Sequence, residues 1–105
     1  TLDLSSAQNF TLTLDESVTA IKITNIADDA SSFTIKIRQD STDGHTIGLS
    51  TFQTGAGTTI PVHYPGGDIV PGITTTAERS DIYTYKTFDG GDSFFGVVGG
   101  QNFLA

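Results

Sequence analysis

The stretch that decides the fold is Asp81–Val98, DIYTYKTFDGGDSFFGVV. Two runs rich in aromatic and β-branched residues, 82–88 and 93–98, flank the short sequence DGGD at 89–92. Residues of these types favour strands, and glycine tolerates the positive φ that tight hairpin turns require. The stretch therefore predicts a β-hairpin with its turn at 89–92.

The side chains of this hairpin divide between two faces. Successive residues of a strand point to opposite sides of a sheet. One face of the first run carries Asp81, Tyr83 and Tyr85, and the other carries Ile82, Thr84, Lys86 and Phe88. Aromatic residues on a hairpin more often pack in a core or pair across strands than bind a ligand. We therefore expect core positions here.

Further strand patterns precede the hairpin. Apolar and polar residues alternate at 9–14, 18–26 and 33–38, which is typical of half-buried strands. Weaker runs follow at 45–52 and 58–64. Because Pro61 has no N–H to donate, the run at 58–64 is expected at a sheet edge or as a short strand.

The order of strands and turns predicts the fold class. The runs at 9–14 and 18–26 are expected to form a first hairpin, and Asp43-Gly44 is a pair that favours hairpins. No window of helical length shows a 3.6-residue period. We predict one all-β domain over 1–105, an antiparallel, jelly-roll-like β-sandwich of roughly seven to nine strands, with an N-terminal arm (1–7) and a C-terminal tail (100–105).

Composition limits the classes of function. The chain has 105 residues, of which 36% are hydrophobic, and no cysteine. A core this thin without disulfides favours oligomerisation. The net charge of −7 argues against a nucleic-acid partner, and no apolar run approaches the roughly 20 residues of a membrane span. The chain has no methionine, so we expect a removed first residue or a fragment of a longer protein.

Few residue patterns suggest chemistry. Metal ligands could be supplied by His45 and His63 with Asp40, Asp43 and Asp68, but these residues lack the short repeated spacing of metal sites. We therefore predict no metal site.

Two loops carry paired aspartates, at 40–44 and 89–92. Neither has the alternating acidic positions and the closing glutamate of an EF-hand. Aspartates in turns usually accept hydrogen bonds from their own backbone, and this is the role that we predict.

Catalytic and cofactor sites are not expected either. The chain has no G-x-S-x-G elbow, and its Gly-Gly pairs do not lead into a helix that could face a phosphate. We predict no catalytic residue and no cofactor. One ligand hypothesis stays open, a sugar-stacking patch made of Tyr64, Tyr83, Tyr85, Phe94 and Phe95.

Several motifs occur in a set order along the chain. They comprise a strand that ends in Gln39, Asp40, Thr42 and Gly44, the turn Tyr64-Pro65-Gly66-Gly67, the run ITTTAERSDIY (73–83), the turn Asp89-Gly90-Gly91, and GQNF (100–103). This order resembles a domain that recurs in virion proteins of tailed bacteriophages. The family more often has tryptophan before Pro-Gly-Gly and in the last strand, whereas this chain has none.

The resemblance implies a structural part of the virion, on the capsid or the tail. We expect a capsid decoration (cement) protein or head-fibre protein, because 105 residues leave no room for a fibre shaft. Its partners would be copies of itself, as a trimer, and the major capsid protein or other virion proteins, without nucleic acid or membrane. The expected subunit contacts are Leu2, Leu4, Phe103 and Leu104. A tail-fibre module that binds a host glycan or protein, and a small glycan hydrolase, are the alternatives.

Overall fold

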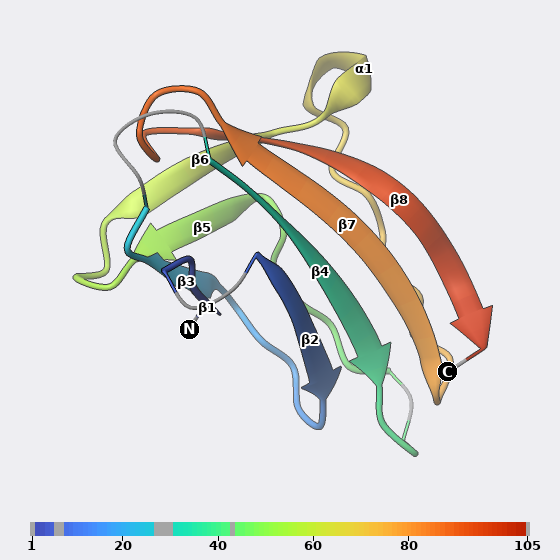
Figure 1. The fold of residues 1–105 in the computed structure, drawn as a ribbon. Coiled ribbons are helices and arrows are strands. Elements are labelled where there is room, and N and C mark those ends of the chain that lie inside the picture. Colours follow the sequence, from blue (N-terminus) through green and yellow to red (C-terminus); the bar gives the residue numbers. More distant parts are fainter. Residues whose placement is uncertain (1, 6–7, 27–30, 43, 105) are drawn as a thin grey trace.

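The computed structural model describes residues 2–5, 8–26, 31–42 and 44–104, and they form an all-β fold (Figure 1). Within these ranges lie eight strands and one short helical turn. Their bounds are β1 Leu2–Asp3, β2 Asn9–Leu14, β3 Ile21–Thr24, β4 Ser31–Gln39, β5 Thr51–Thr54, β6 Thr59–His63, α1 Pro65–Asp68, β7 Arg79–Thr87 and β8 Phe94–Leu104. None of the helices in the described ranges is long and apolar enough to cross a membrane.

The strands form one mixed sheet in the order β1-β3-β5-β6-β8-β7-β4-β2. Parallel pairs join β1 with β3, β2 with β4, β3 with β5, and β6 with β8, whereas the other three pairs are antiparallel. The expectation of a purely antiparallel fold is therefore wrong. Alternation of apolar and polar residues predicts that a segment is a strand, but it does not select the neighbour or its direction.

The predicted hairpin of Asp81–Val98 is confirmed. Strands β7 and β8 pair antiparallel, and the turn between them places Gly90 at φ 71° and Gly91 at φ 96°. An added Cβ at Gly91 would lie 2.7 Å from Cδ1 of Ile26. Glycine is thus required there by both backbone conformation and space.

The predicted first hairpin is wrong. Strand β2 pairs with β4, and β3 pairs with β1 and β5, so β2 and β3 are not neighbours. The expected strand at 45–52 is also shorter: Ile47 forms an isolated bridge with Val18, and β5 begins only at Thr51. Here Gly48 donates its N–H to the carbonyl of Val18, and a Cβ at Gly48 would lie 2.3 Å from the carbonyl oxygen of Thr19. The segments 18–19 and 47–48 therefore cross closely, and this crossing takes the place of regular strand pairing.

The position of Pro61 is explained by how β6 pairs. Strand β6 is short, as predicted, but it lies inside the sheet between β5 and β8. Its pairing with β8 covers only Val62 and His63. Proline is tolerated because it precedes that ladder and needs no N–H on the β8 side.

The sheet curls over so that β5 and β6 lie behind β4, β7 and β8 (Figure 1). Side chains from both parts meet in an aromatic cluster of Phe33, Phe52, Tyr85 and Phe94, each at most 2% exposed. The ring of Phe52 lies 4.9 Å from that of Tyr85 and 5.6 Å from that of Phe94, measured between centroids. Such close ring contacts stabilise beyond simple burial. This cluster holds the two parts of the sheet together.

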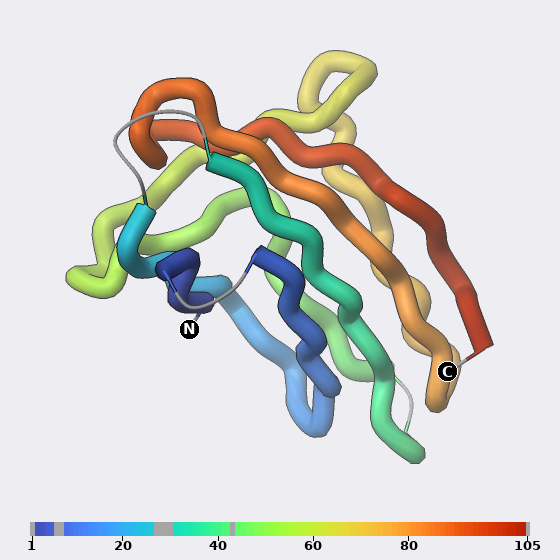
Figure 2. Tube along the Cα trace, in the orientation of Figure 1, coloured from blue at the N-terminus to red at the C-terminus, as the bar shows by residue number. Residues whose placement is uncertain are grey.

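The two terminal segments belong to the sheet. In β1, Leu2 pairs with Ile23, and residues 1, 6 and 7 of the expected arm lie outside the described residues. Residues 100–104 of the expected tail are the end of β8, where Phe103 and Leu104 pair with β7. In Figure 2 the connection 69–78, drawn in yellow, passes behind β7 and β8. It is held there by hydrogen bonds from Gln101 Nε2 to the carbonyl of Gly72 and from the N–H of Thr74 to Asp81.

Candidate functional site

The candidate site lies where β6 separates from β8. After two paired residues, β6 ends at His63 and the chain turns away through α1. This turn needs positive φ at Gly66 (79°), Gly67 (81°) and Asp68 (66°). Glycine and aspartate are among the residues that adopt this conformation most readily. From Gly96 onwards, the sheet order places no described strand beside β8 on this side.

The separation of the two strands leaves an open hollow of about 450 Å³. It is lined by His63, Tyr64, Pro65, Gly67, Asp68, Phe95, Gly96 and Val97. Three residues of the turn at 64–67, namely Tyr64, Pro65 and Gly67, thus border it. The hollow is therefore a direct product of that turn.

The polar side chains of the hollow make hydrogen bonds with neighbouring protein groups. His63 Nδ1 lies 3.0 Å from Asp68 Oδ1, which also accepts the N–H of Tyr64. The hydroxyl of Tyr64 points into the core, where it donates to the carbonyl of Leu49 and lies 2.9 Å from the hydroxyl of Tyr85. Burial raises the pKa of Tyr64 and Tyr85, so both phenols stay neutral at physiological pH. What remains to contact a partner is mostly apolar.

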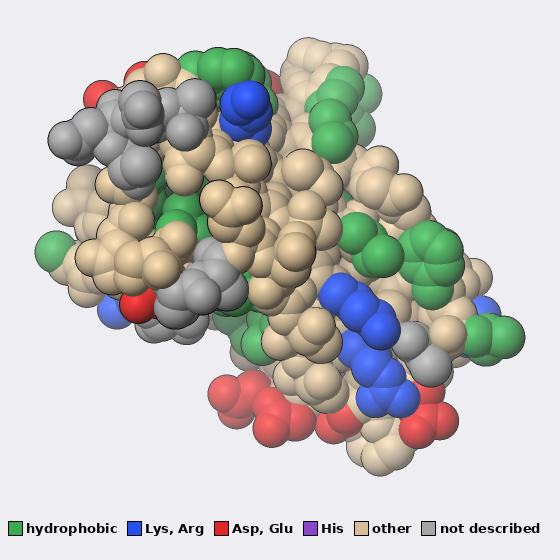
Figure 3. All heavy atoms as spheres, viewed as in Figure 1, with side chains coloured by type: hydrophobic (Ala, Val, Ile, Leu, Met, Phe, Trp, Pro, Cys, Tyr) green, Lys and Arg blue, Asp and Glu red, His purple; other side chains and the backbone are tan. Residues whose placement is uncertain are grey.

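An exposed apolar patch, made of Phe88, Phe95 and Val97, adjoins the hollow. These side chains are 64%, 49% and 50% exposed, respectively. The rings of Phe88 and Phe95 meet edge to face at 5.8 Å, and that of Phe95 also lies 5.5 Å from the ring of His63. Figure 3 shows hydrophobic side chains, in green, over the β7–β8 part of this face. Large exposed apolar groups of this kind mark contact surfaces.

Substitution of Gly96 by alanine should destabilise the fold beside the hollow. An added Cβ would lie 2.5 Å from Cε1 of Tyr85 and 2.7 Å from Cε1 of Tyr64. Both rings are held by their hydroxyl hydrogen bonds, so we expect a loss of about 2 kcal/mol in the free energy of unfolding, measured in urea. Gly72→Ala is the matched control, because nothing lies within 4 Å of its Cβ position. Equal stability of the two variants would contradict the crowding argument.

The sugar-stacking hypothesis finds little support in the positions of its residues. Tyr64, Tyr83, Tyr85 and Phe94 are buried, as expected of core residues, and only Phe95 is exposed. A stacking platform needs rings that a ligand can reach. Four of the five aromatic side chains therefore cannot form one.

Four of the candidate metal ligands form two separate pairs. His45 Nε2 lies 3.3 Å from Asp40 Oδ1, and His63 pairs with Asp68. Asp43 lies outside the described residues. Across the described ranges, no group of three or more histidine and acidic side chains is placed to hold a metal ion.

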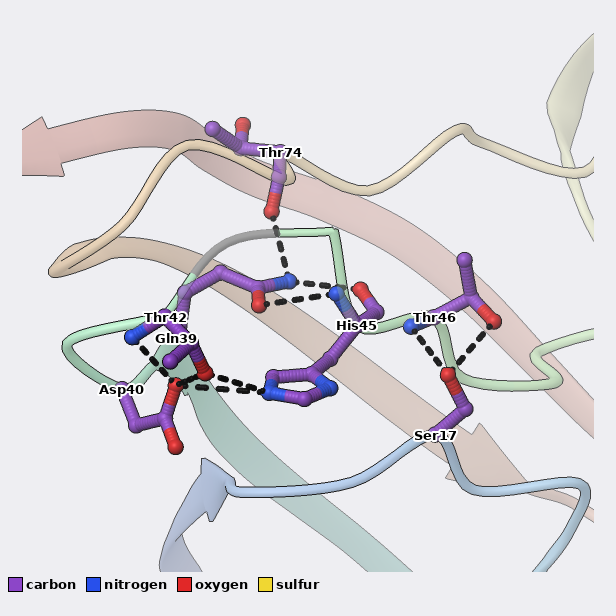
Figure 4. Close-up of polar contacts among 7 residues, drawn as sticks. All are labelled: Ser17, Gln39, Asp40, Thr42, His45, Thr46 and Thr74. Carbon is purple, nitrogen blue, oxygen red and sulfur yellow. Dashed lines mark hydrogen bonds and ion pairs between the residues drawn. The ribbon is translucent and has the colours of Figure 1, made fainter.

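The turn after β4 is held by polar contacts of Gln39, Asp40 and Thr42 (Figure 4). Gln39, which is 1% exposed, donates from Nε2 to the carbonyls of His45 and Thr74. Asp40 accepts hydrogen bonds from the hydroxyl and the N–H of Thr42, at 2.6 and 2.9 Å. The bond from the Thr42 hydroxyl is the main cause that lowers the pKa of Asp40. Near it, Ser17 joins the β2–β3 connection to this turn through Thr46.

The turn between β7 and β8 uses its aspartate in the same way. Asp89 accepts hydrogen bonds from Thr87 and from the hydroxyl and the N–H of Ser93. The bonds from Ser93 are the main cause that lowers the pKa of Asp89. The predicted role of Asp40 and Asp89, hydrogen bonding within their own turns, is confirmed.

The four expected contact residues fall into two places. Phe103 and Leu104, on β8, are 46% and 79% exposed. Leu2 and Leu4 pack against the core, and Leu2 lines a second groove of about 360 Å³ together with Phe10 of β2. This groove lies where the two ends of the sheet order, β1 and β2, approach each other.

Sequence reasoning did not single out Lys86, Phe88 or Val97 as site residues. A signal was available, because the four-residue turn at 89–92 already places Lys86 opposite Phe95. The hollow itself depends on where β6 leaves β8, and no local pattern encodes that position.

The chain shows no significant match to a protein-family model, a curated protein or a solved structure.

Proposed function

We propose that the chain is a structural protein of a bacteriophage virion, a capsid decoration (cement) or head-fibre protein that stabilises the particle through subunit contacts. The observation that carries this proposal is the composition of β8. This strand has no charged residue over Phe94–Leu104, and its exposed large apolar side chains are Phe95, Val97, Val98, Phe103 and Leu104. Such a strand on the surface of an acidic domain favours contact with another protein. The order of the turn motifs, which resembles phage virion domains, supports the same role.

The proposal includes partners, location and architecture. The partners are further copies of the chain and the major capsid protein or other virion proteins. The location is the virion, and the role needs neither a cofactor nor catalytic turnover. The architecture would be a jelly-roll-like sandwich, in which β3, β5 and β6 form one layer and β2, β4, β7 and β8 the other. An experimental structure that measures the packing of these layers would test this description.

The test of the proposal is whether the protein occupies the particle. Purified virions of the phage that encodes the chain should contain it in fixed proportion to the major capsid protein, and a cryo-EM map should place it on the capsid surface. Its absence from purified particles would overturn the proposal. The double substitution Phe103→Ser, Leu104→Ser should lower occupancy without unfolding the domain. Point substitutions are preferable to deletion of 102–105, because the end of β8 is paired with β7.

A second candidate function is a tail-fibre module that binds a host-surface glycan or protein. The observation that favours it is the open hollow with the ring of Phe95 and the imidazole of His63 at its border. Binding of the isolated domain to a glycan array, abolished by Phe95→Ala, would support this alternative. Capsid location in the cryo-EM map would argue against it.

A further inference from the structure

Opposite charges flank the exposed ring of Phe95. His63 of β6 is in register with Phe95 of β8, and Phe95 is in register with Lys86 of β7. Neighbouring strands lie about 4.8 Å apart. The ring of Phe95 therefore has the ammonium side chain of Lys86 on one side and the His63–Asp68 pair on the other.

Both charged side chains have room for a further interaction. Lys86 Nζ lies over the ring of Phe88, 5.2 Å from its centroid, and no described acidic side chain pairs with it. Asp68 is 58% exposed, and its Oδ1 makes the contacts with His63 and with the N–H of Tyr64. Its Oδ2 therefore remains available to accept a hydrogen bond from a cation.

The chemistry of the hollow favours a protein surface over a polyhydroxyl ligand. The polar side chains of His63 and Asp68 are bonded to each other, and the Tyr64 hydroxyl is turned into the core. A sugar would leave many of its hydroxyls without partners there, which costs free energy. Apolar side chains flanked by complementary charges would lose little by entering it.

We propose that this surface is the contact between two copies of the chain. A two-fold axis that lies between the two copies and runs parallel to β8 past Phe95 exchanges the Lys86 side of this ring with the Asp68 side. Each Lys86 then faces Asp68 of the partner subunit, and the Phe95 rings meet at the centre with Phe88 and Val97 around them. A two-fold contact uses the same patch on both copies, so a patch that carries both charges on opposite sides matches itself.

Net charge supports this choice of surface. Each copy carries −7, so association through most of the surface would bring like charges together. At the proposed contact, one cation and one anion of each copy are matched with their opposites. The inference rests on the proposed function, which calls for contacts between copies, and it assigns a two-fold contact in place of the trimer that the resemblance implies.

The first experiment measures the mass of the purified full chain by sedimentation equilibrium. We expect a dimer of twice 11.1 kDa. Phe95→Ser should weaken dimerisation about tenfold or more, as loss of a central aromatic anchor does. Thr13→Ala is the control, because this exposed position on β2 lies at the far end of the sheet order from β6 and away from the Phe95 patch, and it should leave the dimer unchanged. A monomeric or trimeric wild-type chain would overturn the two-fold contact.

The second experiment exchanges the charges between copies. Lys86→Glu places two acidic groups face to face in its own dimer, and Asp68→Lys places two cations face to face. Each variant alone should be monomeric, whereas an equal mixture should form a mixed dimer in which both contacts are again attractive. Circular dichroism checks the fold of each variant, and Asp68→Asn, which keeps a residue suited to positive φ, replaces Asp68→Lys if the turn is disturbed. Asp68→Asn should weaken the dimer and make its dissociation constant less sensitive to salt. No recovery on mixing folded variants would overturn the proposed pairing.

The results separate this inference from the proposed function. A monomer that still occupies the capsid would overturn the dimer contact and leave the virion role standing. A dimer that is absent from purified particles would support the contact and remove the virion role.

Discussion

Substitution of Phe52 by alanine is expected to lower the free energy of unfolding by about 4 kcal/mol, the largest effect of any single substitution considered. Phe52 is fully buried, and its ring contacts those of Phe33, Tyr85 and Phe94. These three rings come from β4, β7 and β8, whereas Phe52 comes from β5 on the other part of the curled sheet. Its removal would leave a cavity where the two parts meet.

Phe88→Ala is the matched control for Phe52→Ala. Phe88 is also a phenylalanine, but it is 64% exposed, and its ring meets the ring of Phe95 and the ammonium group of Lys86. At protein concentrations where the chain is monomeric, we expect a change within about 0.5 kcal/mol for this surface position. Urea unfolding followed by tyrosine fluorescence measures both variants. If Phe52→Ala cost no more than Phe88→Ala, the aromatic cluster would not hold the two parts of the sheet together.

The parts of the fold that were predictable from the sequence are those with local signals. The β7–β8 hairpin has both strands and its turn within Asp81–Val98, so period, turn residues and pairing all lie in one window. The single strand of β4 is equally clear, because Phe33, Ile35 and Ile37 alternate with polar residues and are all buried. Local consistency of this kind is what makes a segment predictable.

The pairing of distant strands was not predictable in the same way. Residue Asn9 of β2 pairs with Thr34, and Ile21 of β3 pairs with Phe52. Nothing in residues 9–24 distinguishes this arrangement from a hairpin, because both bury the same alternate side chains. The parallel direction of these pairs follows from the whole sheet order, which no short stretch encodes.

The candidate site shows the same division. Phe95 was recognisable as an aromatic side chain on the hairpin, and its register with Lys86 follows from the turn length. Asp68, however, lies near Phe95 only because β6 places its partner His63 beside that ring. A surface assembled from three strands therefore required the structure.

The second large effect concerns Asp81, a carboxylate buried between β7 and the connection that precedes it. It is 2% exposed and accepts hydrogen bonds from the N–H of Thr74, the N–H of Asn102 and the hydroxyl of Tyr83, at 2.7, 2.9 and 2.9 Å. Asp81→Asn places an amide N–H where one of these donors needs an acceptor. We expect a loss of about 3 kcal/mol at neutral pH, because hydrogen bonds to a charged group are strong and a buried donor is left unpaired.

Ser80→Ala is the neighbouring control. The hydroxyl of Ser80 is buried and, within the described part of the chain, has no hydrogen-bond partner. Its removal leaves no partner unpaired, so stability should be unchanged or slightly higher. A loss for Ser80→Ala as large as that for Asp81→Asn would show that any change at this buried position is disruptive, and the hydrogen-bond argument would then fail.

The pH dependence of the stability of Asp81→Asn distinguishes the loss of the negative charge from the loss of a hydrogen-bond acceptor. Burial alone would raise the pKa of Asp81, but the hydrogen bonds from Thr74, Asn102 and Tyr83 outweigh burial and hold this pKa below its ordinary value. A lowered pKa in the folded state contributes stability that is present above the unfolded pKa of about 3.9 and is lost as the pH falls through the folded value.

The stability difference between wild type and Asp81→Asn should therefore be greatest near neutral pH and should narrow below about pH 4. Asp40 and Asp89, whose pKa values are also lowered, are present in both proteins, so their contributions cancel in the difference. Urea titrations of both proteins across this range measure it. A difference that stayed constant down to acid pH would mean that the charge of Asp81 adds nothing to the fold. The loss at neutral pH would then come from the buried donor that the asparagine amide leaves unpaired, and not from the charge.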